Sequence, residues 1–306
     1  MRFGVVGLGR MGANIARHAL EKGHEVVCHD STSRVTQELA SEGAEPAGSL
    51  GELVEKLQPP RVVFLYVPHG PITEEVCEQL RELLAEDDVL VDGGNSHWMD
   101  SQRRHKECAA NGIRFLDVGT SGGVTGARRG ACFMAGGERT AYDLIHDLLV
   151  DLAVDEDGVL YAGPSGAGHF TKLVHNAIEF GMVQAIGEGV ELLQRSEFDL
   201  DLPALFDNWN HGSVIRSWLI ELMRDGLAAN PDFGRLSTYV EDTGEVKWIL
   251  SWALDQDIST PVISESQQAL MEYRDSDWPA AKAVALLRHG YGGHPVHMRD
   301  ARPEST

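Results

Sequence analysis

The first half of the chain alternates short apolar runs with amphipathic stretches, and this alternation is the main indication of its fold. Met11–Leu20 and Ile72–Leu84 repeat apolar residues at helical spacing, whereas the runs between such stretches have the length of strands. Strand–helix alternation predicts an α/β domain with a doubly wound, mainly parallel sheet. The predicted strands are Arg2–Val6, Glu25–His29, Arg61–Val67, Val89–Asp92, Arg114–Val118, Ala131–Ala135 and Val159–Tyr161.

A second region begins after Gly163-Pro164, where long helical patterns replace the short runs. We therefore expect two domains, an α/β domain over residues 1–163 and an all-helical domain over residues 164–306. A chain of 306 residues is long enough to give each of them a hydrophobic core. The predicted helices of the second domain are Gly168–Gln194, Leu202–Asn210, Ser213–Asp225, Val246–Leu254 and Pro261–Tyr273.

The first predicted strand runs into a glycine-rich turn that opens the first predicted helix. Gly7 permits a tight turn, Gly9 lets the backbone approach a pyrophosphate, and Gly12 allows close packing of helix on strand. The N–H groups and positive potential at the start of the helix favour phosphate. We therefore predict a Rossmann-type dinucleotide-binding domain, whose phosphate loop is formed by Gly7, Leu8, Gly9, Arg10, Met11 and Gly12.

Asp30 ends the second predicted strand, 18 residues after Gly12, and bears on the choice of cofactor. A carboxylate at this place accepts a hydrogen bond from the ribose 2′-hydroxyl and repels a 2′-phosphate. We therefore expect NAD. NADP is the alternative, because the segment Ser31–Arg34 could hold a phosphate if Asp30 points away.

Two further loops follow predicted strands and should face the same ligand. Val67 and Pro68 end the third strand and are expected to line the cofactor. Asp92–Ser96 contains a Gly-Gly pair that permits close approach of a ligand, and the amide of Asn95 can then bond to substrate or nicotinamide. Each loop could also be a plain turn rich in glycine or proline.

Four polar residues share one face of the long helical pattern that begins near Gly168. At about 100° per residue, Lys172, His175, Asn176 and Glu179 fall within an arc of roughly 100°. A cation, an imidazole, an amide and a carboxylate aligned in this way can grip a polyol and move its protons. The alternative is a solvated face with a Lys–Glu pair.

Composition excludes several classes of function. The net charge of −21 argues against a nucleic-acid partner, because phosphate repels such a surface. No apolar run approaches the roughly 18 residues of a membrane span, and no signal peptide precedes the first strand. We predict no metal site, although His294 and His297 form a possible pair. Four scattered cysteines, without a CxxC pair, indicate reduced thiols in a cytoplasmic protein: Cys28, Cys77, Cys108 and Cys132.

The segments that carry these polar groups resemble a known superfamily. Asp117-Val-Gly-Thr-Ser121-Gly122-Gly123 resembles the substrate loop of the β-hydroxyacid dehydrogenases, and the sequence from Gly166 to Asn176 resembles their catalytic helix. Within that superfamily, K-x-x-H-N-x-x-E at 172–179, D-G-G-N-S at 92–96 and L-R-H-G-Y-G-G-H at 287–294 resemble the 6-phosphogluconate dehydrogenase family. The resemblance runs from residue 1 to residue 294 and fits the short-chain form of that family.

The resemblance implies the oxidative decarboxylation of 6-phosphogluconate to ribulose 5-phosphate, a reaction of the pentose phosphate pathway that reduces a nicotinamide cofactor. It implies that Lys172 is the general base and later the acid at the C3 oxygen, and that Glu179 protonates C1 of the enediol. A lysine can be a base near neutral pH only if burial or nearby cations lower its pKa. No metal is implied, because the keto group itself accepts the electrons.

The resemblance also implies which residues contact the substrate and how the subunits assemble. Lys247 would bind the phosphate, and Arg288 and His294 would reach the phosphate site of a partner subunit, which implies a homodimer or a dimer of dimers. The family usually has Tyr in place of Phe180 and Arg in place of Leu270. The remaining substrate contacts implied are Asn95, Ser121, Gly122, Gly123, His175 and Asn176.

Two rival functions stay open from the residues alone. A hydroxyacid dehydrogenase of the 3-hydroxyisobutyrate or tartronate-semialdehyde type would keep Lys172, Asn176 and Ser121 but would have no use for Glu179 or a phosphate site. An NAD-binding sensor without catalytic activity would need none of the four polar residues of the helix. Release of CO2 together with reduction of the cofactor separates all three functions.

The acidic composition leads to a first prediction. There are 47 acidic residues against 26 basic ones, and only six of the basic residues are lysines, as in proteins adapted to high salt. Because salt screens the self-repulsion, dialysis from molar KCl into about 50 mM salt should unfold the protein, which circular dichroism would detect. Full stability at the lower salt concentration would contradict this adaptation.

Overall fold

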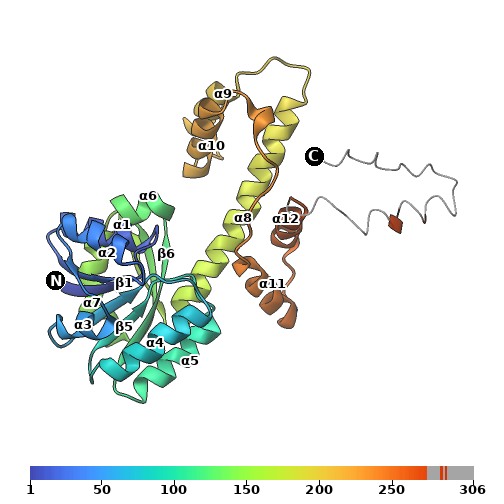
Figure 1. Cartoon of the computed structure of the whole chain (residues 1–306). Helices are drawn as coiled ribbons and strands as arrows, with labels where there is room; N and C mark the ends of the chain where they lie inside the picture. The colour runs from blue at the N-terminus through green and yellow to red at the C-terminus, as the bar shows by residue number, and fades with distance from the viewer. Residues whose placement is uncertain (274–282, 285–286, 288–306) are drawn as a thin grey trace, which may run out of the picture. The chain divides into compact units, whose positions relative to one another are not determined.

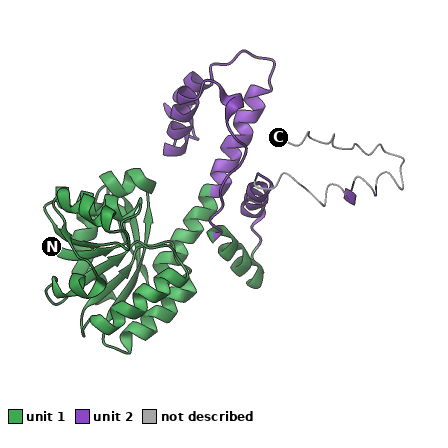
Figure 2. Ribbon diagram, viewed as in Figure 1, with its two compact units in different colours: residues 1–179, 245–258 green, residues 180–244, 259–306 purple. Residues whose placement is uncertain are grey.

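The computed structural model describes residues 1–273, 283–284 and 287 (Figure 1). The chain forms two compact units. Residues 1–179 and 245–258 form unit 1, and residues 180–244 and 259–306 are grouped as unit 2 (Figure 2). The expected boundary between folding domains near residue 163 stays a prediction, because these units record only which parts of the chain pack together.

In the described part of the chain, eight strands form one sheet in unit 1, in the order β3-β2-β1-β4-β5-β6-β7-β8. Every neighbouring pair is parallel except β6 and β7, which confirms the predicted mainly parallel, doubly wound sheet. The strands are β1 Arg2–Val6, β2 Glu25–His29, β3 Glu45–Pro46, β4 Val62–Leu65, β5 Val89–Asp92, β6 Arg114–Ser121, β7 Cys132–Gly137 and β8 Val159–Gly163.

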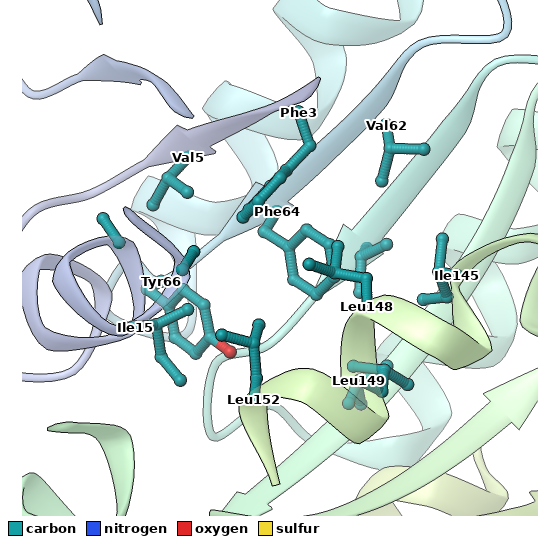
Figure 3. Close-up of a cluster of buried hydrophobic side chains, with 14 of the residues drawn as sticks. Phe3, Val5, Ile15, Val62, Phe64, Tyr66, Ile145, Leu148, Leu149 and Leu152 are labelled. Atoms are coloured by element: carbon teal, nitrogen blue, oxygen red, sulfur yellow. The ribbon is translucent and has the colours of Figure 1, made fainter. Parts of the chain in front are cut away.

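Helices cover both faces of the sheet. Successive side chains of each buried strand point to opposite faces, so apolar side chains on both faces pack against helices. Val5 packs in one cluster with Ile15 of α1 and Leu148 of α7 (Figure 3). Its neighbour Val6 packs in the other cluster, with Leu53 of α3 and side chains of α4. The helices concerned are α1 Gly12–Glu21, α2 Ser33–Ser41, α3 Leu50–Glu55, α4 Pro71–Leu83, α5 Trp98–Ala109, α6 Gly123–Arg129 and α7 Arg139–Leu152.

The rest of the described chain is helical, as expected for the second region. Helix α8, Ala167–Gln194, contributes its first turns to unit 1 and the remainder to unit 2. Inside unit 2, α8 packs with two later helices through Val190, Phe206, Ile220 and Leu227. The later helices are α9 Leu202–Asn210, α10 Trp218–Ala229, α11 Glu245–Asp255 and α12 Pro261–Glu272, of which α11 belongs to unit 1.

Several elements differ from the expectation. Strand β3 was not predicted, β4 is shorter than Arg61–Val67, and β7 and β8 end at Gly137 and Gly163.

Two further differences have a clear local cause. Helix α10 begins at Trp218 and not at Ser213, because the side chain of Ser217 accepts a hydrogen bond from the N–H of Ile220 and caps the helix there. Strand β6 extends to Ser121, three residues past Val118, because antiparallel pairing with β7 prolongs it. None of the described helices has the length and apolar character needed to span a bilayer.

Candidate active site

The glycine-rich turn after β1 forms a cradle that only glycine can build. Gly7 has φ +89°, and a Cβ on it would lie 2.5 Å from the carbonyl oxygen of Tyr66. A Cβ on Gly12 would lie 2.0 Å from the carbonyl oxygen of Gly7, whereas the space around Gly9 is open within 4 Å. No side chain caps α1 at Met11. The turn therefore fits the pyrophosphate of a dinucleotide in the way the sequence predicts.

Both carboxylate oxygens of Asp30 accept backbone hydrogen bonds, and one of these bonds comes from the cradle. The N–H of Leu8 donates to Oδ2 at 2.7 Å, and the N–H of Thr32 donates to Oδ1 at 2.8 Å. Each carboxylate oxygen has a second lone pair, so Asp30 can still accept a ribose hydroxyl. The backbone bonds hold its negative charge beside the phosphate loop.

The expected cofactor residues lie at one edge of the sheet. Strands β1, β4 and β5 are parallel neighbours, so the loops at their carboxyl ends meet at the same edge. These loops carry Gly7–Gly12, then Val67 and Pro68, then Asn95. The strand order reverses between β1 and β4, which is where α/β sheets of this kind bind their ligands.

A buried ion pair braces the loop that carries Asn95. Asp92 Oδ2 accepts hydrogen bonds from Arg104 Nη1 and Ser96 Oγ, each at 2.8 Å, and Asp92 Oδ1 accepts the N–H of Gly94 at 3.0 Å. Asp92 and Arg104 are each 1% exposed, and Glu74 also accepts from Arg104. Removing one partner would leave the other as an uncompensated buried charge, so this pair fixes the D-G-G-N-S turn.

Three of the four polar residues on α8 are directly connected. Lys172 Nζ donates to Asn176 Oδ1 at 2.7 Å and lies 3.4 Å from His175 Nδ1. His175 Nε2 lies 3.0 Å from Ser121 Oγ at the end of β6. Glu179 sits one turn further on, with Oε2 3.8 Å from His175 Nδ1. The helix face and Ser121 at the end of β6 thus form one polar constellation.

Burial lowers the pKa of the partly buried Lys172 below the ordinary value for lysine, while Glu179, Glu245 and Cys132 raise it again. The net direction is the one that a general base working near neutral pH requires. The lowered pKa brings the neutral amine closer to neutral pH, and the bond to Asn176 holds that amine in place.

Asp117 and a set of glycines hold the start of α8 against the sheet. The N–H groups of Gly166 and His169 donate to the two oxygens of Asp117, at 2.7 and 2.9 Å. A Cβ on Gly168 would lie 2.2 Å from the carbonyl oxygen of Asp117, and one on Gly119 would lie 2.5 Å from Lys172 Cβ. Burial raises the pKa of Asp117, and the two N–H groups oppose this shift.

Glu245 is a member of the site that sequence reasoning missed. It begins α11, is 7% exposed, and accepts hydrogen bonds from Asn95 Nδ2 at 2.9 Å and from Asn176 Nδ2 at 3.4 Å. The sequence signal that could have found Glu245 is its spacing from two apolar residues of the same helix. Glu245, Ile249 and Ala253 are four residues apart, and all three are buried. A carboxylate on the apolar face of a helix needs polar partners.

The remaining predicted residues are placed as follows. Gly122, with φ +114°, directly follows Ser121 and caps α6, which begins at Gly123 with φ +59°. Lys247 is exposed on α11 and has interaction partners of its own. Arg288 and His294 lie outside the described residues.

A Rossmann sheet with a phosphate cradle at its switch point, next to a lysine of lowered pKa, defines an NAD(P)-dependent dehydrogenase. The sequence profile of the "NAD binding domain of 6-phosphogluconate dehydrogenase" matches residues 2–163, and that of the "6-phosphogluconate dehydrogenase, C-terminal domain" matches residues 168–270. The chain belongs to the 6-phosphogluconate dehydrogenase family.

Individual relatives agree with this assignment. The chain is 44% identical to YqeC of Bacillus subtilis (strain 168), a candidate 6-phosphogluconate dehydrogenase, over 98% of this chain and 100% of the relative. It is 39% identical, with the same coverage, to the NAD(+)-dependent, decarboxylating 6-phosphogluconate dehydrogenase of Haloferax volcanii. Among solved structures, the Plasmodium falciparum 6-phosphogluconate dehydrogenase superposes with a TM-score of 0.83 at 27% identity, over 99% of this chain and 67% of the other.

The contact between β6 and α8 gives a testable prediction. Gly119→Ala places a methyl carbon 2.5 Å from Lys172 Cβ, so the lysine or the strand must move. We expect kcat with 6-phosphogluconate to fall at least about tenfold, because small misplacements of a reacting group are costly, while the Kd for NAD stays unchanged. The matched control is Gly187→Ala, which adds the same methyl group on α8, where the space around it is open. Equal kcat values in the two variants would contradict this role of Gly119.

Proposed function

We propose that this protein oxidatively decarboxylates 6-phosphogluconate to ribulose 5-phosphate and CO2, with NAD as the electron acceptor. The observation that carries the proposal is the constellation on α8, in which the partly buried Lys172 is 2.7 Å from Asn176 and shares its helix face with Glu179. A dehydrogenase that does not decarboxylate needs the lysine but not the carboxylate. Membership of the 6-phosphogluconate dehydrogenase family supports the same reaction.

Lys172 acts first as the base. Its neutral amine accepts the proton of the C3 hydroxyl while hydride leaves C3, and its lowered pKa makes the neutral form accessible. A bound nicotinamide would supply the hydride acceptor. The product on the substrate is a β-keto acid, and the protonated Lys172 then faces the C3 carbonyl oxygen. Its charge stabilises the negative charge that develops there as the C1 carboxylate leaves as CO2.

Glu179 completes the reaction as the acid. Loss of CO2 leaves an enediol, which must gain a proton at the carbon that carried the carboxylate. Glu179 lies on the same helix face as Lys172, with Oε2 3.8 Å from His175 Nδ1, so the proposed acid and the proposed base stand at the two ends of this face. No additional electron carrier is needed for this half of the reaction, because the ketone itself is the electron acceptor.

The substrate contacts follow from the same constellation. His175, Asn176 and Asn95 offer ring and amide groups to hydroxyls. Ser121, with the N–H groups of Gly122 and Gly123, forms a turn suited to a carboxylate. For the phosphate we propose Lys247 together with Arg288 and His294 of a second copy, and hence a homodimer.

Asp30 supports NAD over NADP. Its carboxylate is fixed beside the phosphate loop by Leu8 and Thr32, and a 2′-phosphate placed there would meet a negative charge. The family includes both NAD- and NADP-dependent enzymes, so the chain's own residues must decide the preference.

The proposal is tested by supplying 6-phosphogluconate with NAD or NADP in molar KCl and trapping CO2 in the same assay. We expect one CO2 for each cofactor reduced and a much higher kcat/KM with NAD. Reduction without CO2, or activity confined to 3-hydroxyisobutyrate or glycerate, would assign the protein to the non-decarboxylating dehydrogenases. Equal kcat/KM with NADP would contradict only the role given to Asp30.

Variants on α8 test the two roles separately. Lys172→Met should abolish hydride transfer but leave the Kd for NAD unchanged, because Met fills similar space without a base. Glu179→Gln should slow the release of ribulose 5-phosphate more than the first burst of NADH, measured by rapid mixing. Unchanged steady-state turnover in Glu179→Gln would remove this residue from the mechanism.

A further inference from the structure

The carboxylate of Glu245 joins three separate parts of the active site. Asn95 comes from the loop after β5, Asn176 from α8, and Glu245 itself from the first turn of α11. Glu245 Oε1 accepts from both amides, at 2.9 Å from Asn95 Nδ2 and at 3.4 Å from Asn176 Nδ2. Each of these amides is also a proposed contact of the substrate. Glu245 therefore contacts two side chains that would bind the substrate.

These bonds determine which way the Asn176 amide faces. An amide has a donor end and an acceptor end, and a carboxylate can only accept. With its NH2 group on Glu245, Asn176 must direct Oδ1 elsewhere, and Oδ1 receives Lys172 Nζ at 2.7 Å. A rotated amide would set its NH2 group against the lysine and its oxygen against the carboxylate, so both contacts would be lost.

The charge of Glu245 also acts on Lys172. Of the groups facing this lysine, Glu179, Glu245 and Cys132 raise its pKa, burial lowers it, and the His175 ring lies 3.4 Å from Nζ. Burial also raises the pKa of the Cys132 thiol, which therefore stays neutral near pH 7. Since Glu245 is itself buried, solvent screens its charge less than that of the partly exposed Glu179.

We propose that Glu245 is a positioning residue of this active site, which orients the amides of Asn95 and Asn176 and through Asn176 holds the amine of Lys172 in place. The catalytic part of this inference rests on the proposed function of Lys172. The geometric part does not, because the contacts exist whatever the substrate is.

The first test measures Lys172 directly and needs no substrate. The rate at which acetic anhydride acetylates Lys172 is followed against pH by peptide mass spectrometry, in the wild type, Glu245→Gln and the control Glu241→Gln. Glu241 is exposed and lies four residues earlier, so the control removes the same charge from the surface. We expect the titration midpoint to move to lower pH by about half a unit or more in Glu245→Gln only. Identical midpoints in all three proteins would overturn the proposal.

A second variant separates charge from geometry. Glu245→Asp keeps the carboxylate but shortens its reach, so the midpoint should stay close to that of the wild type while kcat/KM with 6-phosphogluconate falls about tenfold. In Glu245→Gln the acid limb of the kcat/KM profile should move to lower pH together with the acetylation midpoint. Wild-type kcat/KM in both variants would also overturn the proposal.

The same measurements distinguish a failure of this inference from a failure of the proposed function. If the wild type released no CO2 from 6-phosphogluconate, the proposed function would fail, and the acetylation midpoints alone would decide the role of Glu245. Thermal unfolding of each variant shows whether the fold is intact. A variant that is unfolded is replaced by Glu245→Asp or by Asn176→Asp, which adds a third carboxylate beside Lys172 and should raise its midpoint.

Discussion

The active site depends on the close contact between the first turn of α8 and the end of strand β6. Asp117 accepts the N–H groups of Gly166 and His169, and its negative charge also complements the positive end of the helix. Gly119 and Gly168 allow the backbones to approach to a distance that any side chain would prevent. Because all of the polar groups on α8 are carried by this one helix, a single anchor sets their positions relative to Ser121 at the end of β6.

The electrostatics of Lys172 suit the two roles that we propose for it in one reaction. As a base it must lose its proton easily, and burial favours this; as an acid it must hold the proton again, and the carboxylates of Glu179 and Glu245 favour that. A lysine in a fully apolar pocket would serve the first role only. The arrangement of one amide and two carboxylates around the amine keeps both protonation states accessible.

The cofactor side of the site rests on a different kind of interaction. There the groups that would hold the ligand are mostly backbone N–H groups, presented by Gly7–Gly12 and kept in place by Asp30 and by the contact with Tyr66. On the other side of the switch point, the buried pair Asp92 and Arg104 stiffens the loop that presents Asn95. The two sides meet at the edge formed by the carboxyl ends of the parallel strands.

The sequence by itself determined the class of fold, the phosphate loop and the polar face of α8, because these depend on local periodicity and on residues close together in the chain. It could not place the start of α10, because the cap at Ser217 determines where that helix begins. It also could not predict that β6 continues to Ser121, because pairing with β7 determines the length of that strand. Only the tertiary structure revealed that Glu245 meets Asn95 and Asn176, which are 150 and 69 residues away along the chain. Contacts of such sequence separation arise from packing, and local pattern contains no information about them.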